Sequence, residues 1–241
     1  MNIEKLKEWI ENSGNIVFFG GAGVSTESGI PDFRGEAGIY KTVSEYGVRP
    51  ETILSHTFFM KEPEIFFDYY KNFLLYPDAK PNSAHYALAE LEKRGKLKAV
   101  ITQNIDNLHQ KAGSKNVLEL HGTLYRNYCM KCGAEYDINF VINGENVPKC
   151  KKCAGIVRPD VVLYEESLNS DTLSKAIRFI SEADMLIVGG TSLAVYPAAG
   201  LINYYNGNRL VLINKGTTGF DSRADLIIHR NIGEVFEKIM K

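Results

Sequence analysis

The sequence predicts an α/β fold in which a doubly wound parallel sheet forms the main domain and a second, small domain is inserted into it. Short apolar runs without inside/outside alternation recur along the chain, as is typical of strands buried on both faces of a parallel sheet. These runs are Ile16–Phe19, Ala99–Thr102, Val161–Tyr164, Met185–Val188 and Leu210–Ile213. Helical patterns separate several of them, which favours a Rossmann-like sheet whose ligands bind beyond the carboxyl ends of its strands.

Two segments between the apolar runs have clear helical patterns. In NSAHYALAELEKRG, Ser83 is the expected N-cap and Gly95 the expected end of a helix. In SDTLSKAIRFISEA, which begins at Ser170, the residues Leu173, Ile177 and Ile180 form one apolar stripe. Both helices are therefore expected to pack one face against the sheet.

Length and composition set the broad class. The chain has 241 residues, 44% hydrophobic and 24% charged, which suffices for one large domain or for one large and one small domain. A net charge of -1 provides no global field for phosphate backbones or anionic lipid, so neither nucleic acid nor membrane is the expected partner. The N-terminal segment has helical spacing and acidic residues, unlike a signal peptide, and no apolar run approaches the roughly 20 residues of a membrane span. We therefore expect a cytoplasmic protein with reduced thiols.

The four cysteines of the chain form two Cys-x-x-Cys knuckles. Their separation matches the spacing of a four-thiolate zinc site, in which each knuckle places two sulfurs about 2.3 Å from the metal. A complete thiolate shell leaves no position open for water or substrate, so the zinc is expected to be structural. The predicted ligands are Cys129, Cys132, Cys150 and Cys153.

The cysteine segment also predicts the division into domains. Residues 125–158 are expected to form the small zinc-binding module, a zinc ribbon too small for a core of its own. The main domain then comprises residues 1–124 and 159–241, with a helical part of the small domain within residues 36–80. The sequence contains no evident internal repeat or low-complexity segment.

The cysteine pattern has three other interpretations. Four ordinary buried cysteines would not require paired knuckles, and a thioredoxin-like redox site needs only one pair. Zinc ribbons often bind nucleic acid, and four lysines make the segment locally basic: Lys131, Lys149, Lys151 and Lys152. Acidic residues flank the segment and no aromatic platform is interleaved, so no specific nucleic acid is expected.

The stretch GGAGVSTESGIPDFRG follows the first apolar run. It begins like a dinucleotide fingerprint, whose glycines let backbone N–H groups approach a pyrophosphate, although Thr26 stands in place of the third glycine. Such a turn is often merely a tight connection. The continuation favours a ligand, because Pro31 prevents a helix interior and is followed by Asp32, Phe33 and Arg34. The ring of Phe33 could shield a reactive carbon from water, and the guanidinium of Arg34 could pair with phosphate.

Polar residues follow the next buried strand, where an α/β domain keeps its ligand. Gln103, Asn104 and Asp106 offer different hydrogen-bonding capacities, which suit a ribose and an amide, although such residues also serve as helix caps. His121 follows another short apolar strand, VLEL, and remains available for proton transfer because four thiolates already saturate the metal. The other histidines are taken as structural or surface residues: His56, His85, His109 and His229.

Together these motifs resemble the sirtuin family of NAD-dependent protein deacylases, in particular its small bacterial or archaeal-type members. GAGVS, GIPDFRG, TQNID, HG, the two cysteine knuckles, RPDVV, GTSL and IN occur in the order of the family and span nearly the whole chain. The resemblance implies that NAD and an acyl-lysine peptide meet in a cleft between the two domains. NAD would then be a co-substrate, and zinc would be structural.

The resemblance also implies which residues contact NAD. The pyrophosphate side would be held by Ala22, Ser25, Thr26 and Arg34, and Phe33 would cover the nicotinamide site. The nicotinamide ribose and its water would be held by Gln103 and Asn104, and the carboxamide by Ile105 and Asp106. The adenosine half would be surrounded by Thr191, Ser192, Asn214, Lys215 and Ile232.

The implied reaction is deacetylation of lysine by transfer of the acyl group to ADP-ribose. The acyl oxygen attacks the ribose C1′ as nicotinamide departs, His121 accepts a proton from the ribose hydroxyls, and Asn104 assists. The products are nicotinamide, free lysine and 2′-O-acetyl-ADP-ribose. The substrate peptide would lie as an added strand between two segments, giving broad tolerance of sequence. The residues implied in that groove are Val161, Leu163, Tyr164, Glu165, Leu193 and Val195.

Two departures from the family pattern affect the substrate. Glu165 stands where the family commonly has glycine, which favours basic residues beside the acyl-lysine. Members that remove succinyl groups carry a tyrosine and an arginine three residues on, whereas this chain has Tyr70 and Phe73. An unpaired carboxylate in an apolar pocket costs several kcal/mol, so neutral acyl groups are expected to be preferred.

Three rival functions share parts of this sequence pattern. Protein ADP-ribosyl transfer shares the loss of nicotinamide, and its product would be a peptide that carries ADP-ribose. A zinc-ribbon nucleic-acid binder would show steeply salt-dependent affinity. A hydride-transferring dehydrogenase would be expected to have an acidic residue after its second strand, about 20 residues beyond the glycines, but GIYKTVSEYG follows no buried strand.

Overall fold

The computed structural model describes residues 2–32 and 43–241. Its main sheet has six strands, and every neighbouring pair runs parallel. The order is β3-β2-β1-β7-β8-β9, with β1 at Ile16–Gly20, β2 at Leu97–Thr102, β3 at Val117–Glu119, β7 at Met185–Gly189, β8 at Leu210–Ile213 and β9 at Leu226–Ile228. The predicted doubly wound parallel sheet is confirmed, and the strand order reverses between β1 and β7.

Helices cover both faces of this sheet, and every residue of β1 is buried. Phe18 packs into a core shared with α1 (Asn2–Glu11), α6 (Ser83–Lys93) and α10 (Ile232–Met240). Phe19 packs into the opposite core, with α9 (Ser170–Glu182) and the 3₁₀-helix η4 (Ala198–Tyr204). Burial on both faces explains why the strands are continuous apolar runs.

The predicted helices are confirmed, with one correction to their ends. Gly95 follows α6 in the left-handed region (φ 73°), as expected of a residue that ends a helix. The N-cap of α6 is Asn82 rather than Ser83. Asn82 has the extended backbone that a cap requires and accepts from the N–H of Ala84, whereas Ser83 is already helical. In α9, Ile180 is buried and Leu173 and Ile177 pack beside it, as the stripe predicts.

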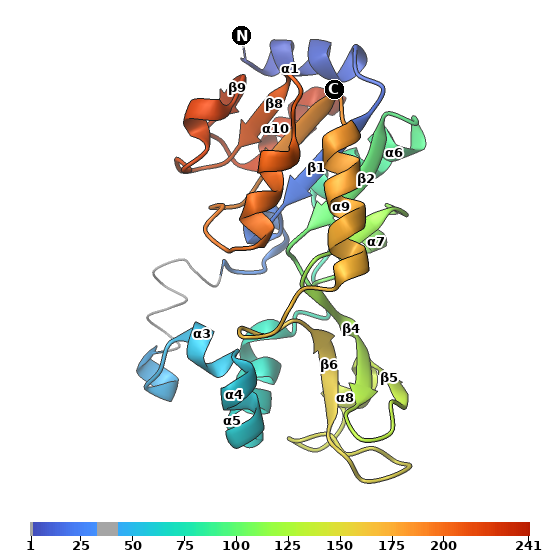
Figure 1. The fold of residues 1–241 in the computed structure, drawn as a ribbon, viewed down its shortest axis with the longest axis vertical. Coiled ribbons are helices and arrows are strands. Elements are labelled where there is room, and N and C mark those ends of the chain that lie inside the picture. The colour runs from blue at the N-terminus through green and yellow to red at the C-terminus, as the bar shows by residue number, and fades with distance from the viewer. Residues whose placement is uncertain (1, 33–42) are drawn as a thin grey trace.

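A second sheet lies at the other end of the elongated molecule (Figure 1). It has three antiparallel strands in the order β5-β4-β6: β4 Gly122–Cys129, β5 Glu135–Asp137 and β6 Val157–Val161. Helices that accompany it are α3 (Pro50–Ile53), α4 (His56–Lys61), α5 (Pro63–Tyr69), the π-helix η3 (Tyr70–Leu74) and α8 (Ile138–Ile142). We propose two domains, 1–124 with 159–241 and 125–158, with α3 to η3 joining the smaller. The boundaries fall within β4 and β6, so these two strands connect the domains.

The small sheet and these helices share one aromatic core. Phe59, Phe66, Phe67 and Tyr70 are fully buried there and pack mainly edge to face. Leu124 of β4 lies in the same cluster. The antiparallel ribbon therefore rests on a helical support drawn from a distant part of the sequence.

The prediction that Val161–Tyr164 forms a strand of the parallel sheet is wrong. Val161 ends β6 of the small sheet, and Leu163 is buried in the aromatic core. Tyr164 forms an isolated parallel bridge with Ser55, its N–H donating to Leu54 and its carbonyl accepting from His56. A short apolar run has the same sequence pattern whichever core it enters, which is why periodicity did not separate the two cases.

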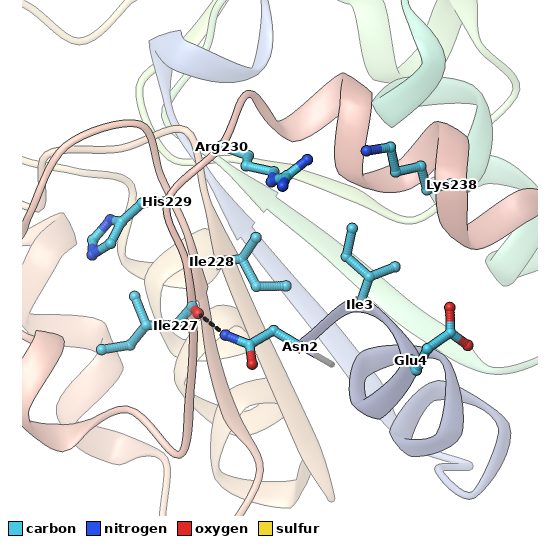
Figure 2. Close-up of a pocket in the computed structure, with 8 residues that line it drawn as sticks. All are labelled: Asn2, Ile3, Glu4, Ile227, Ile228, His229, Arg230 and Lys238. Atoms are coloured by element: carbon cyan, nitrogen blue, oxygen red, sulfur yellow. Dashed lines mark hydrogen bonds between the residues drawn. The ribbon is translucent and has the colours of Figure 1, made fainter.

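The remaining elements are short and connect the larger ones. They are η1 (Ala22–Val24), η2 (Thr26–Ser28), α7 (Leu108–Lys111) and η5 (Asp221–Arg223). At the outer edge of the main sheet, Asn2 of α1 donates to the carbonyl of Ile227 in β9 beside an open hollow of about 640 Å³ (Figure 2). Of the predicted site residues that the structure describes, none lines that hollow. Within the described ranges, no helix is both long and apolar enough to cross a bilayer.

Candidate active site

A cavity of about 280 Å³ lies at the carboxyl ends of the parallel strands, between the main sheet and the small domain. It is located at the switch point between β1 and β7, where doubly wound folds bind ligands. The predicted site residues that line it are Ala22, Ser25, Gln103, Asn104, Ile105, Asp106, His121, Val161, Leu163, Tyr164, Glu165, Thr191, Ser192 and Val195. Segments far apart in sequence therefore converge on one space.

Some predicted site residues lie outside the cavity lining. Thr26 is exposed and its hydroxyl donates to the carbonyl of Gly23, while Asn214 and Lys215 follow β8 at the same edge of the sheet. Leu193 is 5% exposed with its side chain in a core, and Ile232 is 2% exposed and packed beneath Gly189. Neither Leu193 nor Ile232 is among the residues that line the cavity. Phe33 and Arg34 lie outside the described residues.

The glycine turn after β1 packs directly against the end of β7. Gly23 donates its N–H to the carbonyl of Gly190 at 2.8 Å, and a Cβ at position 23 would lie 2.8 Å from the Cα of Gly190. A Cβ at Gly21 would lie 2.8 Å from the Cβ of Thr191. Both glycines are thus needed for close approach of two backbone segments, which brings η1 to the switch point.

Ser25 is the centre of a hydrogen-bonded group at the cavity. It is 1% exposed, donates to Asp106 Oδ2 at 2.6 Å and accepts from Asn104 Nδ2 at 3.1 Å. Burial raises the pKa of the Asp106 carboxyl, against the lowering effect of its hydrogen bonds from Ser25 and the N–H of Leu108. These bonds connect the glycine turn to the loop after β2 and fix the direction of three polar side chains.

Gln103 makes the corresponding connection to β7. Its amide Nε2 donates to the hydroxyl of Thr191 at 3.1 Å, and that hydroxyl also accepts from the N–H of Leu193. The carbonyl of Gln103 lies 3.0 Å from Nδ1 of His121. The loop after β2 therefore orients both the histidine and the segment after β7.

His121 is held in one tautomer. A carbonyl oxygen only accepts, so the 3.0 Å contact with Gln103 places the hydrogen on Nδ1. In the neutral ring the lone pair is then on Nε2, which makes that atom the basic one. The following Gly122 has φ 73°, and a Cβ there would lie 2.0 Å from the carbonyl of Asp160, so the chain can enter β4 only through glycine.

The small-domain side of the cavity is held by an ion pair around Glu166. The guanidinium of Arg158 donates to both carboxylate oxygens, at 2.7 and 3.0 Å, and Nδ1 of His56 lies 2.8 Å from one of them. The N–H of Leu163 donates to the same carboxylate. Burial opposes ionisation, but the bonds from Arg158 and Leu163 lower the pKa of Glu166 to about 2. The segment with Tyr164 and Glu165 is thereby fixed along the cavity.

The four predicted zinc ligands lie together at the far end of the ribbon. Their Sγ atoms are all within 4.8 Å of one another, with Cys129 and Cys153 at 3.5 Å and Cys132 and Cys150 at 3.6 Å. Sulfurs about 2.3 Å from a tetrahedral zinc would be about 3.8 Å apart, so the arrangement fits the metal. None of the four forms a disulfide. None of the four cysteines lines the cavity, in agreement with a structural role.

Comparison with known proteins identifies the family. The Sir2 family pattern matches residues 21–197. The chain is 59% identical to an NAD-dependent protein deacetylase of Clostridium acetobutylicum, over 99% of this chain and 98% of the relative. The chain belongs to the Sir2 family. Two solved Sir2 structures each align with all of this chain over 98% of their own length. One is a complex with a p53 peptide and NAD⁺ (TM-score 0.88, 39% identity). The other is a complex with a deacetylated p53 peptide and 3′-O-acetyl-ADP-ribose (TM-score 0.90, 40% identity).

As a Sir2 protein, the chain is an NAD-dependent protein deacetylase with a four-cysteine metal site. The cavity suits NAD in its chemistry, because amide, hydroxyl and carboxyl groups converge at the switch point beside the glycine turn. The predicted resemblance, the enzyme class and the fold are confirmed.

Sequence reasoning did not assign several residues of this Sir2 site. Glu51 and Leu74 line the cavity, and Arg158 with Glu166 supports its rim. The sequence signal for the pair was slight: an arginine within RPDVV and the second of two glutamates after it. Neither local periodicity nor spacing indicates that an arginine will be buried, since its partner is eight residues away and beyond a strand end.

Proposed function

We propose that the chain removes acetyl and other neutral acyl groups from protein lysines, and that NAD is consumed with release of nicotinamide, free lysine and 2′-O-acetyl-ADP-ribose. The observation that carries this proposal is the convergence of a tautomer-fixed His121 with the Ser25–Asn104–Asp106 group on one cavity. That cavity is bounded on one side by the sheet and on the other by a segment suited to an extended peptide.

The residues at the switch point would hold NAD. When bound, NAD supplies a ribose carbon whose bond to nicotinamide can be broken. The turn with Ala22 and Ser25 would hold the pyrophosphate side through backbone N–H groups, together with Thr26 and Arg34. The groups that would bind the nicotinamide half are Phe33, Gln103, Asn104, Ile105 and Asp106, and those for the adenosine half are Thr191, Ser192, Asn214, Lys215 and Ile232.

His121 is proposed as the general base. With Nδ1–H donating to the carbonyl of Gln103, Nε2 is the atom that accepts a proton from a ribose hydroxyl. Asn104 is proposed to orient the ribose and a water, since its Nδ2 is engaged with Ser25 and its side-chain carbonyl accepts. The carbonyl of Gln103 therefore keeps His121 in the reactive tautomer throughout.

The peptide is proposed to bind in extended form between the segments after β6 and β7. Val161, Leu163, Tyr164 and Glu165 would line one wall, and Val195 the other, with Leu193 contributing backbone groups. Backbone pairing gives affinity with little side-chain selectivity, which accords with a broad range of protein substrates.

A preference for neutral acyl groups is supported by the charge of the cavity. Among the described residues that line it there is no lysine or arginine, while Asp32, Glu51 and Glu165 contribute carboxylates. Tyr70 is fully buried, and burial raises the pKa of its hydroxyl, so it offers no charge. Phe73 stacks on Tyr69 with ring centroids 4.9 Å apart. A succinyl carboxylate would find no cation among these groups and would cost several kcal/mol to bury.

The test is an assay of nicotinamide release and of product mass with matched acetyl- and succinyl-lysine peptides. We expect nicotinamide, deacetylated peptide and 2′-O-acetyl-ADP-ribose from the first peptide, and turnover at least tenfold lower from the second. His121→Ala is expected to lower kcat by a factor on the order of 10²–10⁴ with NAD binding retained by calorimetry. A peptide that gains the mass of ADP-ribose would instead support ADP-ribosyl transfer, and equal turnover of both peptides would contradict the acyl preference.

A further inference from the structure

Helix α10 is capped by a residue from the glycine turn instead of by its own N-cap. Its N-cap, Asn231, makes no side-chain cap bond, and its Nδ2 donates to Glu234 at 3.1 Å. The N–H of Gly233 in the first turn instead donates to Glu27 Oε2 at 2.7 Å. A carboxylate at this position satisfies a backbone donor that the helix cannot satisfy and interacts favourably with the helix dipole.

The absence of a side chain at Gly233 is what admits this carboxylate. A Cβ built on Gly233 would lie 2.6 Å from Glu27 Oε2 and 2.8 Å from Oε1. Glycine is otherwise a poor choice in the first turn of a helix, because it increases the entropy lost on folding. The pair of Glu27 and Gly233 is therefore a fitted contact between segments 206 residues apart.

Glu27 lies in η2, two residues beyond Ser25 of the proposed pyrophosphate site. The same short segment is held from its other side by Asn82, whose Nδ2 donates to the carbonyl of Val24 at 2.8 Å and to the hydroxyl of Ser28 at 2.9 Å. Helices α6 and α10, which supply these two contacts, pack together in one core. The turn is thus clamped between two helices, and Glu27 is the clamp on the side of α10.

We infer that Glu27 is a positioning residue for NAD, which acts by capping α10 and thereby fixing the turn that holds the pyrophosphate. This inference rests on the proposed placement of NAD at Ala22 and Ser25. The carboxylate of Glu27 affects NAD binding in two opposite ways, through its hydrogen bond and through its charge. Loss of the clamp weakens binding of NAD, whereas loss of a negative charge near a diphosphate strengthens it. The clamp is inferred to be the larger effect because a cap contact fixes backbone geometry, while the charge is exposed and screened.

Two substitutions separate these effects. Glu27→Ala removes both the cap and the charge, and is expected to raise the NAD dissociation constant severalfold. The upper limit is about fivefold, reached if the roughly 1 kcal/mol of a lost cap is expressed wholly in NAD binding. Glu27→Gln keeps an oxygen that accepts from Gly233 and removes only the charge, so its dissociation constant should stay within twofold. Gly233→Ala is expected to raise the NAD dissociation constant by a similar factor, because the added Cβ displaces the carboxylate of Glu27 although Glu27 itself is retained. The matched control is Glu234→Ala, an acidic residue of the same helical turn.

The experiment is calorimetry of NAD binding to the full chain, with steady-state kinetics for each variant. The KM for NAD should rise in Glu27→Ala, while kcat and the KM for acetyl peptide stay within twofold. Unchanged or tighter NAD binding by Glu27→Ala, or a lowered Tm alone, would overturn the inference and leave the proposed function intact. Failure of the unsubstituted protein to bind NAD would overturn both.

Discussion

The two sheets of this molecule are stabilised by different means. The parallel sheet is buried on both faces, and two large apolar cores lie against it. The tip of the antiparallel ribbon has a buried cluster of only Cys129, Cys150 and Val157, with Tyr136 and Phe140 partly buried beside it. Two of its three buried residues are metal ligands, so the tip has almost no apolar interior of its own.

The comparison shows where each region derives its free energy of folding. Burial of one large apolar side chain contributes about 1.5–3 kcal/mol, and the parallel sheet buries many of them. A structural zinc site contributes about 10–16 kcal/mol of apparent binding free energy, which a ribbon tip can use in place of a core. The cavity lies where the two regions meet, so its NAD side is expected to be rigid without metal and its peptide side to depend on metal.

The largest expected effect is the loss of the metal. Removal of zinc by a chelator, or the substitution Cys150→Ser, should unfold the ribbon tip and abolish deacetylation while the parallel sheet stays folded. The single tryptophan of the chain, Trp9, packs against the core of the parallel sheet and reports on that region alone. We expect unchanged Trp9 fluorescence, together with release of one zinc per chain and loss of tyrosine signals in near-ultraviolet circular dichroism.

The matched control is Lys152→Ala, because only the backbone N–H of Lys152 contacts a thiolate. This variant should keep its metal and its activity. If metal-free protein deacetylated at the parent rate, or if Trp9 fluorescence changed together with metal release, the two regions would not be stabilised independently.

The second expected effect concerns the junction of the two regions. Glu166→Ala leaves the guanidinium of Arg158, which is 7% exposed, without its carboxylate partner. Breaking a buried ion pair in this way costs about 3 kcal/mol. We expect a lower urea midpoint in equilibrium unfolding and a higher KM for peptide, because the segment with Leu163 and Tyr164 loses its anchor. Glu165→Gln, one residue away and exposed, should change the midpoint little.

The same carboxylate predicts a pH dependence. The pKa of Glu166 is lowered to about 2 in the folded protein, from an ordinary value near 4.5. The stabilisation is therefore fully present above pH 4.5 and is lost as the pH falls toward 2. Glu166→Gln should flatten the acid limb of the stability profile in that window. A profile with the same slope as that of the parent protein would show that other carboxyls carry the acid sensitivity.

The sequence predicted those parts of the molecule that depend on local pattern. Continuous apolar runs identified four strands of the parallel sheet, and the spacing of cysteines identified the metal site, because both follow from residue type and separation. The three-residue strand β9 was missed, whereas β3, which is equally short, was expected as a strand from VLEL. Val161–Tyr164 was assigned to the wrong sheet, because burial in the aromatic core and burial in the parallel sheet select the same residues.

Within the site, the order of the sequence motifs predicted that Ser25, Asn104 and His121 share one site, and all three line the same cavity. The sequence did not reveal which of the predicted site residues present their side chains to the cavity. Leu193 and Ile232, both predicted site residues, pack into the cores and are not among the residues that line the cavity. That distinction depends on packing between elements, which a linear pattern does not contain.

The smallest expected effect distinguishes two neighbouring residues at the start of α6. Asn82 caps the helix, and its own N–H donates to Nδ1 of His85 at 3.2 Å, so a reciprocal capping box is formed. Asn82→Ala should lower the free energy of unfolding by about 1 kcal/mol or somewhat more, because the contacts to Val24 and Ser28 are lost with the cap. Ser83→Ala should change it by less than about 0.5 kcal/mol. The measurement is urea unfolding followed by Trp9 fluorescence. Equal losses for the two variants would restore Ser83 as a cap and would remove Asn82 from the clamp on the glycine turn.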